Sequence, residues 1–157
     1  MAHYTKQRRY GHDELVVDAF VHGAGLSAAI AGGAYLLPRV WIEGGGNAAA
    51  FLVYWVALVS MLAFSAAYNL TPHSPLKWVL RRFDHSAIYL LIAGTYMPLL
   101  YQLGQGWLAP SLAAVLWLGT AVGVAVKVLL PGRYDGVAVA TYLALGWVGL
   151  IATPSFW

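Results

Sequence analysis

The sequence predicts an all-α membrane protein, a polytopic bundle of about five transmembrane helices. Three observations lead to this fold class. Of the 157 residues, 61% are apolar and only 10% are charged, whereas soluble domains are about 45–50% apolar and about 25% charged. Apolar stretches of about 20 residues, the length that crosses a bilayer, recur along the chain. The loops between them are short and rich in turn residues, which favours antiparallel neighbours.

Five stretches are long and apolar enough to be spans, and a polar segment precedes them. They cover residues 15–37, 48–70, 85–103, 108–130 and 137–157. Residues 1–14 therefore form an N-terminal segment, and residues 15–157 form a single transmembrane domain, a partial version of a larger bundle if further spans follow. The first stretch is a retained helix, not a cleaved signal peptide, because it is too long and is interrupted by Asp18 and His22.

Small residues recur on one face of the first span. Gly25, Ala29 and Gly33 follow each other at four-residue intervals, so they lie on the same side of a helix. Stripes of this kind let membrane helices approach closely. We expect this face to pack against a neighbouring helix.

The basic residues are distributed unevenly between the two sides of the predicted bundle. Arg39 lies alone on one side. The other side receives eight: Lys6, Arg8, Arg9, Lys77, Arg81, Arg82, Lys127 and Arg133. Loops rich in Lys and Arg stay in the cytoplasm, so we expect a multi-pass protein of the cell membrane with a cytoplasmic N-terminus. Anionic lipid head groups are the expected partners of Lys77, Arg81 and Arg82.

Several classes of site are excluded by the composition and the motifs. The chain contains no cysteine, which excludes disulfides, thiolate metal sites and cysteine nucleophiles. It contains no HExxH, no phosphate-binding glycine motif and no GxSxG motif. Its basic residues form a collar at the membrane and not an aromatic-interleaved surface, so no nucleic-acid partner is expected.

Polar residues converge at the cytoplasmic ends of the first three spans. Ionisable residues inside a span are costly and therefore mark functional sites. Six polar residues, four of them ionisable, fall at these ends: Asp18 and His22, Ser65 and Asn69, Asp84 and His85. The first two pairs are each spaced four residues apart, which places both members on one helix face. We expect the six residues to form one polar cluster.

Each of these residues also has a purely structural interpretation. Asp84 could cap the third span, because Asp accepts hydrogen bonds from N–H groups at helix starts. His22 could bond to a neighbouring carbonyl, and Ser65 to the carbonyl four residues before it. Asn69 could simply end a helix, and His85 could lie at the membrane interface. The convergence of all six at one depth favours the functional interpretation.

Two stretches of the chain resemble the hemolysin III family. They are SAAYN at residues 65–69 and LKWVLRRFDHSAIYLLIAGTYMP at residues 76–98. Two shorter matches are His22-Gly23 and YLALGW at residues 142–147. That family belongs with the adiponectin and progestin receptors in a superfamily of seven-span membrane proteins. The resemblance covers nearly the whole chain and corresponds to the first five of the seven spans.

The resemblance implies a zinc site at the cytoplasmic side of the bundle. In the family, the ligands are a histidine near the end of the second span and two histidines of the seventh, and an aspartate early in the third span contacts the metal through water. Ser65 and Asp84 match the family's serine and aspartate, but Asn69 stands where the family has the second-span histidine. A catalytic zinc site uses three protein ligands. We therefore expect no tightly bound zinc in this chain.

The resemblance also implies two classes of function. The first is a pore-forming, cytolytic or channel-type role, after which the bacterial branch is named. The alternative is metal-dependent hydrolysis of a lipid amide such as ceramide, in which Asp84 would accept a proton from the metal-bound water. Because the zinc ligands are incomplete, family membership without a demonstrable catalytic activity ranks first, the pore or channel second and the hydrolase third.

The uneven distribution of basic residues gives a testable topology. A reporter inserted at His73 should lie in the cytoplasm, and one inserted at Gly106 should lie outside, because cytoplasmic loops retain Lys and Arg. Paired phosphatase and fluorescent-protein insertions measure this. The reverse pattern, or the same side for both insertions, would overturn the predicted orientation.

Overall fold

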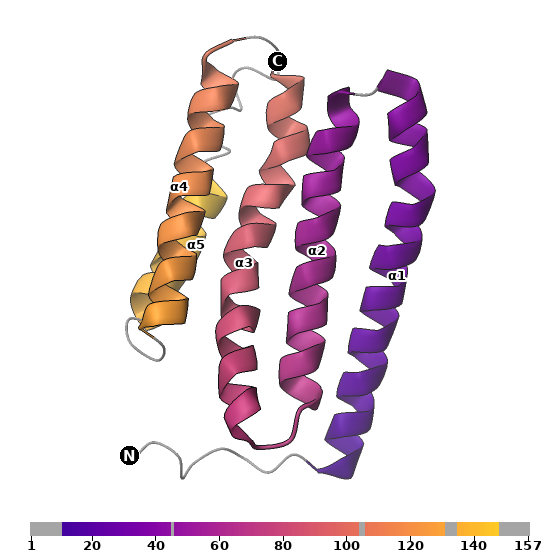
Figure 1. Ribbon diagram of the computed structural model, residues 1–157, viewed down its shortest axis with the longest axis vertical. Helices are drawn as coiled ribbons and strands as arrows, with labels where there is room; N and C mark the ends of the chain where they lie inside the picture. Colours follow the sequence, from indigo (N-terminus) through magenta and orange to yellow (C-terminus); the bar gives the residue numbers. More distant parts are fainter. Residues whose placement is uncertain (1–10, 45, 104–105, 131–134, 148–157) are drawn as a thin grey trace.

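A computed structural model of the chain describes residues 11–44, 46–103, 106–130 and 135–147. These residues form five helices and no strand: α1 (His12–Gly44), α2 (Gly46–Leu70), α3 (Pro75–Gln102), α4 (Leu108–Leu129) and α5 (Asp135–Trp147). Consecutive helices pack side by side, with α1 to α4 in a row and α5 packed against both α3 and α4 (Figure 1). The predicted up-and-down helix bundle is confirmed.

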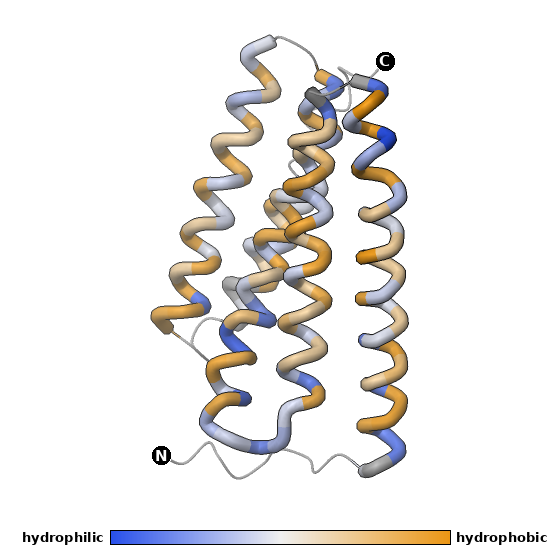
Figure 2. Tube along the Cα trace, turned by 45° about the vertical axis from the view of Figure 1, so that its right-hand side comes forward, coloured by the Kyte–Doolittle hydropathy of each residue, from blue (hydrophilic) through white to orange (hydrophobic). Residues whose placement is uncertain are grey.

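Three helices are long and apolar enough to cross a membrane. The apolar segments cover residues 13–43, 47–70 and 108–129. The 28-residue α3 has sufficient length but carries more polar residues, and α5 has 13 described residues, since residues 148–157 of the predicted fifth span lie outside the described part. Hydrophobic residues follow the helices through their middle, and hydrophilic residues gather toward their ends (Figure 2). The protein therefore has the fold of a membrane protein.

The third helix begins ten residues earlier than predicted. Ser74 is its N-cap, and its hydroxyl accepts a hydrogen bond from the backbone N–H of Lys77 at 3.3 Å. Pro75 follows at the first helical position, where its fixed φ suits a helix start. The interpretation of Asp84 as the cap of this helix is therefore wrong, because Asp84 lies well inside it. The basic residues before Asp84, which are Lys77, Arg81 and Arg82, therefore lie in the first turns of α3 and not in a loop.

The first helix continues past its predicted end. It passes through Pro38 and Arg39 and ends at Gly44, where the sequence predicted an end at Leu37. A proline inside a helix removes one backbone donor, a loss that membrane helices tolerate when neighbouring groups satisfy the freed carbonyl. The connection to α2 is correspondingly shorter than predicted.

The small-residue stripe of α1 packs against α2, as predicted. The indole of Trp55 lies directly over Gly33, where an added Cβ would overlap the ring. The indole Nε1 donates a hydrogen bond to the carbonyl of Ala29 at 2.8 Å, and Leu62 lies 3.8 Å from the position of a Cβ on Gly25. Two side chains of α2, Trp55 and Leu62, thus fill the space that the three small residues leave open.

Glycines also set the remaining helix contacts. A Cβ on Gly94 of α3 would lie 2.9 Å from that of Ala57 of α2. The ring of Tyr89, which is 2% exposed, occupies the space over Gly123 of α4. The side chain of Leu145 of α5 lies against Gly119 of α4. Each consecutive pair of helices therefore has a glycine against which the neighbouring helix packs, with its backbone at Gly94 and with a large side chain at the others.

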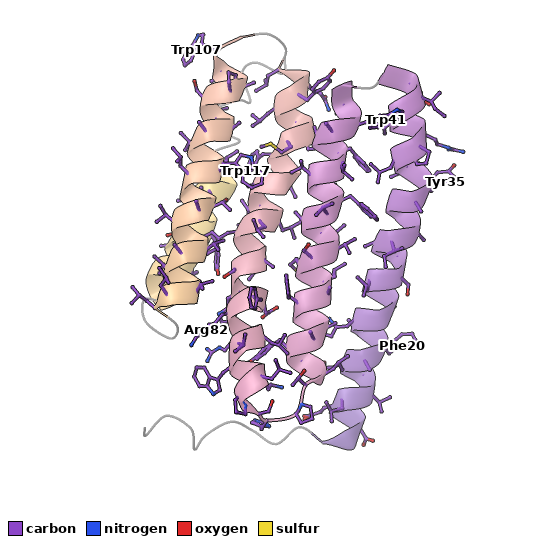
Figure 3. The ribbon with its side chains drawn as sticks, in the orientation of Figure 1. Phe20, Tyr35, Trp41, Arg82, Trp107 and Trp117 are labelled. Carbon is purple, nitrogen blue, oxygen red and sulfur yellow. The ribbon has the colours of Figure 1, made fainter. Side chains whose placement is uncertain are left out.

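The outward face of α1 is apolar and aromatic. Phe20, Tyr35 and Trp41 are 75%, 57% and 68% exposed, and Phe20 and Tyr35 project away from the other helices (Figure 3). Among the described helices α1 packs chiefly against α2. The rest of its surface is suited to lipid.

We predict that Gly33→Ala destabilises the protein, because the added methyl group must displace the Trp55 ring. Overpacking of this kind costs about 1–3 kcal/mol. The matched control is Gly32→Ala, since a Cβ at Gly32 meets nothing within 4 Å. Thermal unfolding in detergent, followed by circular dichroism, should show a lower midpoint for Gly33→Ala only. Equal midpoints would contradict the packing of Trp55 on Gly33.

Candidate functional site

A polar contact joins α1 to α2 near the end of the bundle that carries the basic residues. The amide Nδ2 of Asn69 lies 3.3 Å from Nε2 of His22, and it also donates to the carbonyl of Ser65 at 2.9 Å. The Ser65 hydroxyl lies 3.4 Å from the same nitrogen. Since an amide nitrogen only donates, Nε2 of His22 is the acceptor of this contact. Three of the six predicted residues therefore form one hydrogen-bonded group.

Asp84 lies on the same side of the α2–α3 pair as Ser65. The rings of Phe64 and Phe83 stack across this pair, with centroids 5.3 Å apart. Ser65 and Asp84 each follow one residue later, about 100° further around their helices. In antiparallel neighbours these two rotations turn toward the same side. Asp84 is half-buried there, and it makes no hydrogen bond or ion pair with any residue in the described part of the chain.

A lysine holds the C-terminal end of α2. Lys77 is only 7% exposed, and its Nζ donates to the carbonyls of Thr71 at 2.8 Å and Asn69 at 3.4 Å. Cations are favourable at helix C-termini because the last carbonyls lack helical partners. The contact of Lys77 with anionic lipid head groups stays a prediction. The seven-residue spacing of Lys77 from Asp84, two turns on one helix face, was the signal that it belongs beside the polar group.

A pocket opens next to this group, at the turn between α2 and α3. Its volume is about 250 Å³. Its lining combines apolar side chains with polar groups of the turn: Leu15, Asn69, Leu70, Thr71, Pro72, His73 and Lys77. The pocket gives small polar molecules or water access to Asn69 from the membrane surface.

Besides Asp84, two further residues of the predicted cluster lie outside the hydrogen-bonded group of His22, Ser65 and Asn69. Asp18 lies on the same face of α1 as His22, but it pairs with no residue that the structure describes. His85 is turned about 100° from Asp84 on α3, and its carbonyl accepts a hydrogen bond from the Tyr142 hydroxyl of α5 at 3.0 Å. His85 therefore takes part in the α3–α5 contact.

The described residues do not fit the zinc site that the resemblance implies. They contain no group of three histidine or acidic side chains close enough to hold a metal ion. The lone pair of His22 Nε2, which a zinc ion would need, already accepts the hydrogen bond from Asn69. We therefore derive no catalytic step through a metal in this chain.

The family model described as haemolysin-III related matches residues 11–157, nearly the entire chain. The chain belongs to this family. The resemblance seen in residues 65–69 and 76–98 is thereby confirmed, and the residues that carry it lie on α2 and α3 beside the polar contact.

Two curated relatives of this haemolysin-III related protein are bacterial. Hemolysin-3 of Bacillus cereus is 31% identical over 140 residues, which are 88% of this chain and 64% of the relative. The Hemolysin-3 homolog of Bacillus subtilis (strain 168) is 30% identical over 142 residues, which are 88% of this chain and 66% of the relative. This chain thus spans slightly less than two thirds of their length. No solved structure matches it.

We predict that the purified chain carries well under one zinc ion per molecule. Asn69→His alone should restore little affinity, because one added imidazole supplies only one of the three protein ligands that a catalytic site uses. Elemental analysis after mild chelation measures both. A near-stoichiometric zinc that resists chelation and is lost in Asp84→Ala would contradict this prediction.

Proposed function

We propose that the protein is a cell-membrane protein that permeabilises lipid bilayers. One of its relatives carries the name Hemolysin-3 and another the name Hemolysin-3 homolog. The observation that carries the proposal is the polar group at one end of α1 and α2, where Asn69 contacts His22 and Ser65. Asp84 of α3 lies on the same side of the α2–α3 pair as Ser65.

A polar side on membrane helices lowers the barrier to ions. Charged side chains inside spans face water-filled cavities or protein interiors, since exposure to hydrocarbon is costly. Asp84 forms no ion pair with a described residue, and a carboxylate without a counter-charge inside a span requires a hydrated environment. A hydrated region around Asp84 shortens the apolar layer that an ion must cross.

Metal-dependent hydrolysis of a lipid amide is the second candidate. The observation that favours it is the position of Ser65 and Asp84, which occupy family metal-site positions and lie at nearly the same level on one side of α2 and α3. It ranks second because the described residues supply no three-ligand group.

The proposal predicts leakage that depends on Asp84. The purified chain, reconstituted into vesicles of phosphatidylglycerol and phosphatidylcholine, should release an entrapped dye without added metal. Asp84→Asn should slow release by about tenfold, because a fixed charge raises the local concentration of counter-ions. Asp13→Asn, which removes an exposed carboxylate from the first turn of α1, is the control and should leave release unchanged.

Two outcomes would overturn this function. The first is release no faster than from empty vesicles. The second is equal release from wild type, Asp84→Asn and Asp13→Asn, which would show nonspecific disruption of the bilayer. Cleavage of a ceramide upon addition of zinc, without leakage, would move the hydrolase to first place.

A further inference from the structure

A second polar group lies between α3 and α4. Ser86 and Lys127 are 4% and 5% exposed. Arg82 precedes Ser86 by one turn on the same face of α3, and its Nη1 donates to the carbonyl of Val128 of α4 at 3.5 Å. Arg82 lies on the side of α3 that faces the lower ends of α4 and α5 (Figure 3). This group is about 200° around α3 from Asp84, so it is separate from the site described above.

Two donors in this group lack an acceptor. Nε of Arg82 and Oγ of Ser86 are both buried and make no hydrogen bond. A buried donor left unsatisfied costs about 1–3 kcal/mol, and more when it is charged. No carboxylate among the described residues pairs with Arg82. The two donors therefore indicate an acceptor that is not among the described residues.

Lys127 adds a second cation at the same level. The hydroxyl of Thr120 donates to the carbonyl of Tyr89 at 3.3 Å, and this contact together with the contact of Arg82 to Val128 sets the register of α3 and α4. Lys127 follows Thr120 by seven residues, so it lies on the same face of α4, toward α3. The acceptor that suits Arg82 beside a lysine is an anion, and the guanidinium fork matches a phosphate.

We propose that the phosphate group of an anionic phospholipid binds between α3 and α4, at Arg82 and Ser86 with Lys127 beside them. A lipid fits better than a soluble anion because α4 is one of the membrane-spanning helices. Val79 and Leu129, which are 44% and 74% exposed at the same ends of these helices, offer apolar surface for its acyl chains. Anionic lipids are enriched in the leaflet that faces basic segments.

The neighbouring cations have other partners, which makes one of them a matched control. The Arg81 guanidinium lies 5.7 Å from the centroid of the Trp78 ring. Lys77 is engaged by carbonyls of the α2 terminus. Arg81→Gln therefore removes the same charge as Arg82→Gln, one position away, without removing the buried donor.

The test measures binding of a fluorescent phosphatidylglycerol to the purified full chain in detergent. Arg82→Gln should weaken binding by about tenfold, the effect of losing a charge-assisted hydrogen bond, while Arg81→Gln should change it less than about twofold by the same reasoning. Ser86→Ala should weaken binding to a smaller extent. Equal losses in Arg81→Gln and Arg82→Gln would overturn the site in favour of diffuse surface charge.

A second measurement uses the wild-type protein and does not depend on how the variants fold. Phosphatidylglycerol should raise the midpoint of thermal unfolding above that in phosphatidylcholine, because a ligand that binds the folded state stabilises it. Inorganic phosphate at millimolar concentration should neither raise the midpoint nor displace the labelled lipid. Equal midpoints in the two lipids would overturn the site, and displacement by inorganic phosphate would overturn the lipid as its ligand.

Discussion

Packing of the neighbouring helix onto glycines is the interaction on which this bundle depends. In a bilayer the lipid tails are as apolar as the side chains, so helices associate by van der Waals packing and hydrogen bonds and not by exclusion of water. Each consecutive pair of helices meets at one such residue: Gly33, Gly94, Gly123 and Gly119. The short spacing at Gly33 lets Trp55 reach the carbonyl of Ala29. Along the same seam, His22 comes within hydrogen-bond distance of Asn69.

The α3 helix separates two polar environments. On one side Asp84 turns toward Ser65, at the level of the stacked phenylalanines. On another side Arg82 and Ser86 turn toward α4 with unsatisfied donors. Asp84 and Arg82 are only two residues apart in the sequence, but residues at this spacing on a helix do not face each other. The helix rotates them about 200° from each other, so each needs a partner from a different source.

The order and packing of the helices follow from the sequence, and the small-residue face of α1 could be read from its four-residue spacing. The start of α3 could not, because three cations before Asp84 are costly in lipid and were assigned to a loop. The signal for the true start is Ser74 followed by Pro75, an N-cap and a first-turn proline. The sequence predicted that His22 and Asn69 lie close together, in one polar cluster. The engagement of Lys77 with carbonyls was not, since side-chain direction within the turn depends on how α2 ends.

The attachment of α1 chiefly to α2 has a consequence for biogenesis. The contact of Trp55 with Ala29 and that of Asn69 with His22 lie wholly within the first 70 residues. A nascent chain can therefore complete this hairpin, with its polar contact already made, before α3 leaves the ribosome. The insertion machinery then receives a preformed pair of helices, and the later helices add to a surface that is already in place.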